Sequence, residues 1–208
     1  MSKTMFRQVP KTGVIFTTAS AMKLGFYRGH PDWCNFGQGQ PETGFLDGGL
    51  ERISHIHIDE GDHEYAPVGG LLELREAIAN MYNTLYRKNK KSKYTAENVS
   101  IAGGGRTILT RLVAAIDTIN LGHFLPDYTA YEELLSTFKG FNTIPIMLDP
   151  DNGYTFSHQD LRKEIQGKGL GAVLASNPCN PTGKTISGRH LREWIKVSRD
   201  TGCSLIMD

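Results

Sequence analysis

Apolar residues recur along most of this chain with one of two periods, and the period changes from segment to segment. Between Leu71 and Leu85 they return every three or four positions, which predicts an amphipathic helix over about residues 70–87. The same spacing predicts helices over about residues 109–116, 128–139 and 160–166, and after Ser187, which can cap its helix. Shorter apolar runs predict strands over residues 99–102, 123–125, 142–148, 171–176 and 203–207.

Strands that alternate with helices in this way predict an α/β fold. The expected architecture is a three-layer α/β/α sandwich, in which helices cover both faces of a mostly parallel sheet. Pro145 has no N–H group to donate, so the strand over residues 142–148 is expected at an edge of the sheet. Residues 35–49 hold five glycines and a proline, which predicts a long irregular connection before the regular part of the chain.

Length and charge exclude several classes of function. A chain of 208 residues has room for one sizeable core with a small appendage. Its net charge of +1 creates no field that would attract nucleic acid or a membrane surface. The basic run over residues 87–93 is interpreted as the solvated end of a helix. We therefore expect no nucleic-acid partner.

The cysteines and histidines indicate the compartment of the protein and whether it binds a metal. The three cysteines are scattered and odd in number, which suits a reducing compartment, and no apolar stretch is long enough to span a bilayer. We expect a cytoplasmic protein without membrane association. His55, His57 and His63 imitate a metal site, but no cysteine or carboxylate stands at a supporting spacing, so no metal is expected.

Four polar or glycine-rich segments each follow a different predicted strand. In parallel sheets, ligands bind beyond the carboxyl ends of the strands, so these segments can surround one ligand. They are residues 103–106, 126–128 and 177–183, and Asp208.

The chemistry of three segments indicates the kind of ligand. Three glycines before Arg106 would let backbone N–H groups, a helix N-terminus and a guanidinium hold a phosphate, although glycines also suit an ordinary tight turn. Tyr128 can stack on a flat ring or pack in the core. Asp208 ends an apolar strand, where a carboxylate needs a cationic partner such as a protonated heterocycle.

The remaining segment, SNPCNPTGK, contains two Asn-Pro pairs behind an apolar strand. The prolines restrict the backbone, and the rigid turn presents an asparagine amide, which is both donor and acceptor, to the strand ends. A structural turn would not need two asparagines. We interpret the segment as a loop that recognises a ligand.

These segments resemble, in order, the motifs of one enzyme family. NPCNPTG is similar to the NPxNPTG signature of class I and II aminotransferases, which are fold type I pyridoxal-phosphate enzymes. The resemblance runs from about Asn35 to Asp208, and six motifs in register are strong evidence. The other five are FGQGQPE (with Gln40 where an acid is common), YAPVGGLLELREAIANMY, GGGRTILTRLVAAI, PDYTAY and SLIMD.

The resemblance implies pyridoxal 5'-phosphate as the cofactor and gives the matching residues roles in binding it. Gly104, Gly105 and Arg106 would hold the phosphate. Tyr128 would stack on the pyridine ring, and Asp208 would pair with the ring nitrogen and keep it protonated. The protonated ring would then act as the electron sink for the substrate carbanion.

Further roles concern the substrate and a second subunit. Asn180 would hydrogen-bond to the cofactor's phenolic oxygen and help to seat the substrate carboxylate, and Gly39 would contact substrate through its backbone. Tyr65 would reach the phosphate of the neighbouring subunit's cofactor, which implies a homodimer. The implied reaction transfers an amino group between an amino acid and a 2-oxo acid.

The resemblance also implies a division of the chain and an incomplete enzyme. Residues 1–45 would contribute to a small domain and the substrate site, and residues 46–208 would form the large cofactor-binding domain. The family's Schiff-base lysine is expected beyond Asp208, so we assign no catalytic residue here and expect a sheet incomplete at its C-terminal end. Lys184 is not expected to replace that lysine, and the chain alone is expected to be inactive. A lyase or synthase of the same fold, and a non-catalytic binding module, stay open as alternatives.

Overall fold

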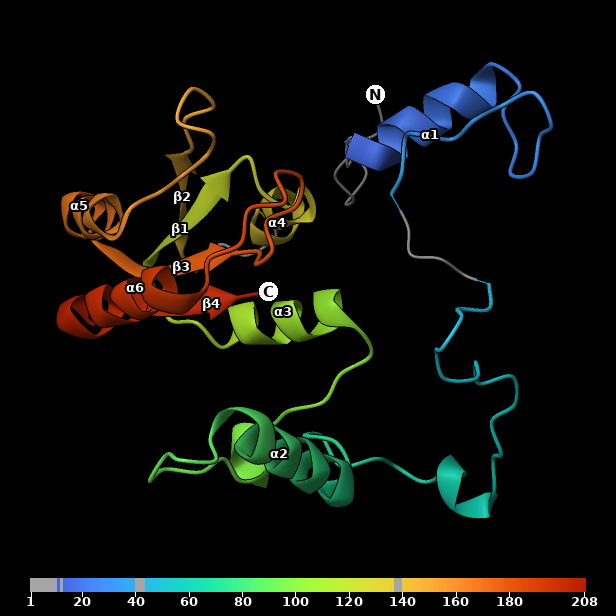
Figure 1. The fold of residues 1–208 in the computed structure, drawn as a ribbon, viewed down its shortest axis with the longest axis horizontal. Coiled ribbons are helices and arrows are strands. Elements are labelled where there is room, and N and C mark those ends of the chain that lie inside the picture. The colour runs from blue at the N-terminus through green and yellow to red at the C-terminus, as the bar shows by residue number, and fades with distance from the viewer. Residues whose placement is uncertain (1–10, 12, 40–43, 137–139) are drawn as a thin grey trace, which may run out of the picture. The chain divides into compact units, whose positions relative to one another are not determined.

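The computed structural model describes residues 11, 13–39, 44–136 and 140–208 (Figure 1). By its internal contacts the chain divides into two compact units, Met1–His63 and Glu64–Asp208, and each is described by itself. The predicted assignment of residues 1–45 to a small domain stays a prediction. Gln40, one position of the FGQGQPE motif, lies outside the described residues.

The first unit carries little regular structure. Its described helices are α1 (Gly13–Lys23) and the short 3-10 helix η1 (Glu60–His63). Phe26 and Trp33 pair with their ring centroids 5.5 Å apart, yet none of the unit's described residues is buried. Since burial of apolar surface is the main force that stabilises a fold, this unit has no core of its own among the described residues.

The second unit is built on one sheet of four parallel strands. The predicted edge position of Pro145 is confirmed, because its strand pairs on one side only, where Pro145 lies opposite His123. The four corresponding strand predictions are also confirmed. The strands are β1 (Asn120–Leu125), β2 (Asn142–Met147), β3 (Leu170–Ala175) and β4 (Ser204–Met207), and their order is β2-β1-β3-β4.

Apolar side chains alternate between the two faces of this sheet, as the period of a strand requires. Along β3, Val173 and Ala175 join one buried cluster, whereas Ala172 and Leu174 join another. Helices cover both clusters, so the predicted three-layer α/β/α architecture is confirmed (Figure 1). The first cluster lies under α5 (His158–Lys168) and α6 (Gly188–Thr201), and the second under α3 (Gly105–Ala114) and α4 (Ala130–Leu135).

A side-chain hydrogen bond caps the N-terminus of α5 but not that of α6. Ser157 caps α5, because its Oγ accepts the N–H of Asp160 at 3.1 Å. Ser187 occupies the cap position of α6 as predicted, but its side chain makes no capping hydrogen bond. The α6 helix is held instead by burial of Trp194, whose ring lies 5.6 Å from that of Phe124.

The predicted strand over residues 99–102 is wrong, although the helix before it is confirmed as α2 (Leu72–Tyr86). Val99 has extended backbone, but the segment pairs with no strand in the described part of the chain. The Ile101 N–H donates to the Gly69 carbonyl at 2.9 Å, and Arg75 Nε donates to the Val99 carbonyl at 2.9 Å. An apolar run becomes a strand only beside a free strand edge, and here a loop and a side chain take its backbone groups.

Two smaller differences concern helix length and membranes. The helix predicted over residues 128–139 begins two residues later, as α4, and its predicted end at residues 137–139 lies outside the described residues. Among the described helices, none combines the length and the apolar character needed to cross a bilayer.

Candidate functional site

Three of the four predicted segments lie around Asp208 at the carboxyl ends of β3 and β4. The Asp208 N–H donates to the Ala175 carbonyl at 3.0 Å, and the Asn177 N–H donates to the Asp208 carbonyl at 2.9 Å. A Cβ atom added at Gly105 would lie 3.9 Å from Asp208 Oδ1. Asp208 therefore stands between the start of α3 and the Asn-Pro loop. The loop follows β3 as predicted, whereas the expectation that residues 103–106 follow a strand is wrong, because residues 99–102 pair with no strand in the described part of the chain.

The Asp208 carboxylate is oriented by a buried tyrosine. Tyr131, on α4, donates its O–H to Asp208 Oδ2 at 2.6 Å. Burial and this hydrogen bond both raise the pKa of Tyr131, so the phenol stays protonated and remains a donor. Oδ1 has no hydrogen-bond partner among the described residues. One carboxylate oxygen is thus held and the other is free to meet a cation.

The glycine turn before α3 has the form of an anion cradle. Gly104 precedes the helix at φ 95°, a conformation that favours glycine, and a Cβ at Gly103 or Gly104 would meet no atom within 4 Å. The backbone N–H groups of Gly105 and Arg106 have no partner within the described residues. Free donors at the N-terminus of a helix are the usual setting for a phosphate.

Arg106 and Tyr128 lie together at this turn. Arg106 Nη2 donates to the Tyr128 hydroxyl at 3.0 Å, and the guanidinium lies 5.8 Å from the centroid of the Tyr128 ring. That hydrogen bond is the main reason why the pKa of Arg106 is raised. The contact fixes an aromatic ring next to the free N–H groups, so a flat ligand with a phosphate could touch both.

The two asparagines of the Asn-Pro loop have different surroundings. The Asn177 side chain donates to the Ile186 carbonyl at 3.0 Å and accepts the Ile186 N–H at 2.8 Å, so it closes the loop. Asn180 is exposed, and its side-chain amide makes no hydrogen bond within the described residues. The expectation of a ligand-reading loop thus fits Asn180, whereas Asn177 has a structural partner.

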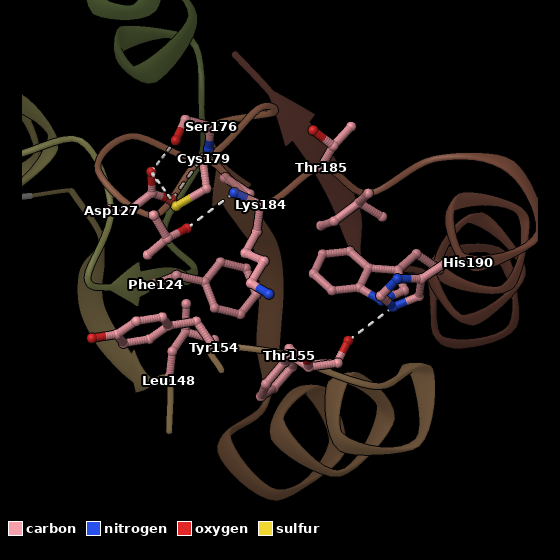
Figure 2. Close-up of a pocket in the computed structure, with 15 residues that line it drawn as sticks. Phe124, Asp127, Leu148, Tyr154, Thr155, Ser176, Cys179, Lys184, Thr185 and His190 are labelled. Carbon is pink, nitrogen blue, oxygen red and sulfur yellow. Dashed lines mark hydrogen bonds between the residues drawn. The ribbon is translucent and has the colours of Figure 1, made fainter. Parts of the chain in front are cut away.

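Sequence reasoning assigned no role to three residues that organise this edge, namely Tyr131, Asp127 and Ser176, although each stands in a segment that it singled out. Asp127 is 6 % exposed, and its carboxylate accepts the Tyr128 N–H at 2.7 Å. It also accepts the N–H and the O–H of Ser176, which lies beside it in Figure 2. Burial raises the pKa of Asp127, while the hydrogen bonds from Ser176 and Tyr128 oppose that rise. The only available signal was a charged residue between an apolar strand and an aromatic.

A cavity of about 110 Å³ lies beside Asp127 and Ser176 (Figure 2). Its apolar walls include Phe124 and Trp194, which belong to the cluster under α5 and α6. Tyr128 and Tyr131 belong to the opposite cluster, and none of the six predicted cofactor residues of this edge lines the cavity. We therefore locate the candidate site at the strand ends rather than in this cavity.

Other predicted residues stand apart from these contacts. Gly39 belongs to the first unit, so its predicted substrate contact stays a prediction. Tyr65 is fully exposed, and its role toward a second subunit is likewise untested. Lys184 lines the cavity instead of approaching Asp208. In the described part of the chain no cluster of three or more His, Cys, Asp or Glu side chains is placed to hold a metal ion.

Comparison with known proteins gives consistent matches. The family model described as aminotransferase class I and II matches residues 31–208. A probable aspartate/prephenate aminotransferase of Aquifex aeolicus is 26% identical over 181 residues, which are 85% of this chain and 44% of that protein. The 1-aminocyclopropane-1-carboxylate synthase 6 of Arabidopsis thaliana is 26% identical over 77% of this chain and 32% of its own length.

Solved structures agree with these matches. Aspartate aminotransferase from Thermus thermophilus with maleate superposes with a TM-score of 0.61 at 26% identity, over 72% of this chain and 38% of that one. A tetra mutant of the same enzyme with tryptophan gives a TM-score of 0.72 over 96% of this chain and 50% of its own, at 22% identity, which bears on the fold alone. The chain spans less than half the length of the curated relatives it matches.

Proposed function

Because the chain belongs to the class I and II aminotransferase family, we propose that residues 46–208 form the cofactor-binding part of a pyridoxal-phosphate-dependent aminotransferase. The observation that carries the proposal is the Asp208 carboxylate, held on one side by Tyr131 and open on the other, next to the free N–H groups that begin α3. Such an acid is suited to a protonated ring nitrogen beside a bound phosphate.

The residues present fit the chemistry of this cofactor at four points. Its phosphate would take the free N–H groups of Gly105 and Arg106, beside which the two preceding glycines leave open space. Its ring would lie against Tyr128, its phenolic oxygen would accept from the free amide of Asn180, and its ring nitrogen would face Asp208. No lysine of the described part hydrogen-bonds to any of these groups.

The protein's part in the reaction is electrostatic and positional. Bound pyridoxal phosphate supplies an electron sink for the carbanion formed at an amino acid's Cα. Asp208 would keep a proton on the ring nitrogen of the bound cofactor, because a neighbouring carboxylate favours the charged form of that nitrogen. Tyr131 keeps the carboxylate in place by donating to its other oxygen. Asn180 and Gly39 would seat the substrate, an amino acid or a 2-oxo acid.

We expect the working form to be a cytoplasmic homodimer in which Tyr65 contacts the cofactor phosphate of the partner subunit. Since no lysine side chain of the described part hydrogen-bonds to Asp208, Tyr128 or Asn180, we expect the 208-residue chain to bind the cofactor without turning over amino acids. Both points are expectations from the family resemblance. Sedimentation of the cofactor-loaded chain and a transaminase assay would test them.

A lyase or synthase is the second candidate, since one matched relative is named a synthase. The same residues would hold the cofactor in both cases. An aminotransferase needs a 2-oxo acid acceptor, whereas a lyase releases ammonia without one. Release of ammonia by the protein in the absence of an acceptor would therefore reject transamination. A non-catalytic binding module would bind the cofactor and do neither.

The decisive experiment measures binding of pyridoxamine 5'-phosphate, which has the ring, phenolic oxygen and phosphate but no aldehyde to react with lysines. We expect saturable binding by the chain in calorimetry, weakened about 30-fold in Asp208→Asn because a charge-assisted hydrogen bond is lost. Asp200→Asn is the matched control, since Asp200 lies on α6 and pairs with Arg162. Equal affinity in the two variants would contradict the proposed role of Asp208.

A further inference from the structure

One buried carboxylate at the strand ends has no role in the chemistry above. Asp127 follows β1, and its three donors come from Tyr128 on one side and from Ser176, at the end of β3, on the other. The Tyr128 N–H lies 2.7 Å from Oδ1, and the Ser176 N–H lies 3.2 Å from Oδ2. This carboxylate therefore ties the ends of two neighbouring strands together.

The hydrogen-bond chain continues from Ser176 into the Asn-Pro loop. Ser176 uses its hydroxyl hydrogen toward Asp127, and its oxygen accepts the Asn180 N–H at 3.0 Å. The complete series runs Tyr128, Asp127, Ser176, Asn180. Its two ends are the residues that would touch the face and the phenolic oxygen of the cofactor ring.

The surroundings of Asp127 argue against a role in stability alone. No lysine or arginine of the described part forms an ion pair with this carboxylate, and its near neighbours are His123, whose pKa is lowered by burial, and the Cys179 Sγ at 4.0 Å. A buried carboxylate without a cation costs stability compared with an apolar residue. The two N–H groups and the hydroxyl that converge here need an acceptor. A carboxylate suits them because it can only accept hydrogen bonds.

We propose that Asp127 is a positioning residue, which fixes the Tyr128 ring and the Asn180 amide relative to each other through the Tyr128 backbone and the Ser176 hydroxyl. The inference rests on the proposed cofactor site. It extends the proposed function to two residues, Asp127 and Ser176, that do not touch the cofactor in the proposed site. The glycine turn and its free N–H groups lie outside this hydrogen-bond series.

The test compares binding of pyridoxamine 5'-phosphate with binding of inorganic phosphate, the latter followed by ³¹P NMR. Ser176→Ala removes the link between Asp127 and Asn180 with little change in volume. We expect it to weaken pyridoxamine phosphate binding about tenfold and to leave the affinity for inorganic phosphate within about twofold. The circular-dichroism band of the bound ring should weaken as well, because that ring is less firmly oriented.

Ser198→Ala is the matched control. Ser198 also donates from a partly buried hydroxyl to a carbonyl, that of Cys203 at 2.6 Å, but it lies on α6. This variant should lose similar stability and keep both affinities. Asp127→Asn is a second variant of nearly the same shape, expected to weaken ring binding about 30-fold because it disturbs both arms of the series. Far-UV circular dichroism checks that each variant is folded.

The outcomes separate this inference from the proposed function. If the wild-type chain does not bind pyridoxamine phosphate, the proposed function fails and the positioning role fails with it. If the wild-type chain binds and Ser176→Ala binds equally well, only the positioning role is overturned. A variant that loses affinity for both ligands in equal measure also overturns it, because that pattern belongs to general damage to the fold.

Discussion

Two aspartates end parallel strands in this sheet, and their surroundings are opposite. Asp127, after β1, is buried and its carboxylate accepts three hydrogen bonds from the protein. Asp208, after β4, is exposed and accepts one side-chain hydrogen bond, from Tyr131, while its second oxygen is free within the described residues. The same side chain at the carboxyl ends of two strands thus accepts three hydrogen bonds in one place and one side-chain hydrogen bond in the other.

The largest difference should appear in stability. Asp127→Ala leaves three donors without an acceptor, so we expect the free energy of unfolding in urea to fall by about 3 kcal/mol. Asp208→Ala removes an exposed carboxylate and leaves a single donor, the Tyr131 hydroxyl, without its acceptor, so its loss should be smaller, about 1 kcal/mol. Equal losses of unfolding free energy in the two variants would mean that the different surroundings of the two aspartates do not affect stability.

The two asparagines of the Asn-Pro loop extend the contrast to a second pair of identical residues. Asn177→Ala removes both hydrogen bonds to Ile186, and we expect the unfolding free energy to fall by about 2 kcal/mol. Asn180→Ala should change stability by no more than about 0.5 kcal/mol but weaken pyridoxamine phosphate binding about tenfold. Calorimetry and urea unfolding of both variants measure the two effects; a stability loss at Asn180 would argue that its amide serves the fold.

Tyr131 connects the open carboxylate to the core, so its hydroxyl should matter to both properties. In Tyr131→Phe we expect the unfolding free energy to fall by about 1 kcal/mol and pyridoxamine phosphate affinity to fall about fivefold, because Asp208 Oδ2 loses its donor. Tyr82→Phe, at an exposed tyrosine on α2, is the control. An unchanged affinity in Tyr131→Phe would show that Asp208 needs no orientation.

The smallest expected effect is a pH dependence of stability. Burial raises the pKa of Asp127, so the folded chain holds a proton at pH values where the unfolded chain has released it. This contribution is complete below a pH of about 4 and is lost as pH rises through the raised pKa. As pH rises across this window, the free energy of unfolding of the wild-type chain should therefore fall by less than about 1 kcal/mol compared with that of Asp127→Asn. Urea unfolding at a series of pH values measures both.

Asp200 provides the control of opposite sign. A hydrogen bond from Arg162 lowers the pKa of Asp200, so its contribution is present above the ordinary pKa and is lost as pH falls. The difference in unfolding free energy between the wild-type chain and Asp200→Asn should therefore increase as pH rises, whereas the difference between the wild-type chain and Asp127→Asn should decrease. Slopes of the same sign would contradict the assigned surroundings of one of the two acids.

Much of the fold follows from periodicity. Alternation along the strands and the three-to-four spacing of the helices predicted the layers and the parallel sheet, because each period puts apolar residues on one face. The strand predicted over residues 99–102 failed because pairing depends on a partner that local sequence does not describe. The segments that hold Asp208, Tyr128 and Asn180 lie at the strand ends as expected, whereas the roles of these residues stay predictions.

The sequence by itself determined the segments that end β1, β3 and β4, and hence the polar residues that these strands bring to the edge of the sheet. The glycine turn over residues 103–106 reaches the same edge without the strand that was predicted before it. Only the tertiary structure decided what each polar residue does there. Tyr131 and Asp208 are 77 positions apart, and Asp127 and Ser176 are 49 apart. A hydrogen bond depends on distance and direction at the atomic scale, and no local pattern encodes these for residues so far apart in the chain.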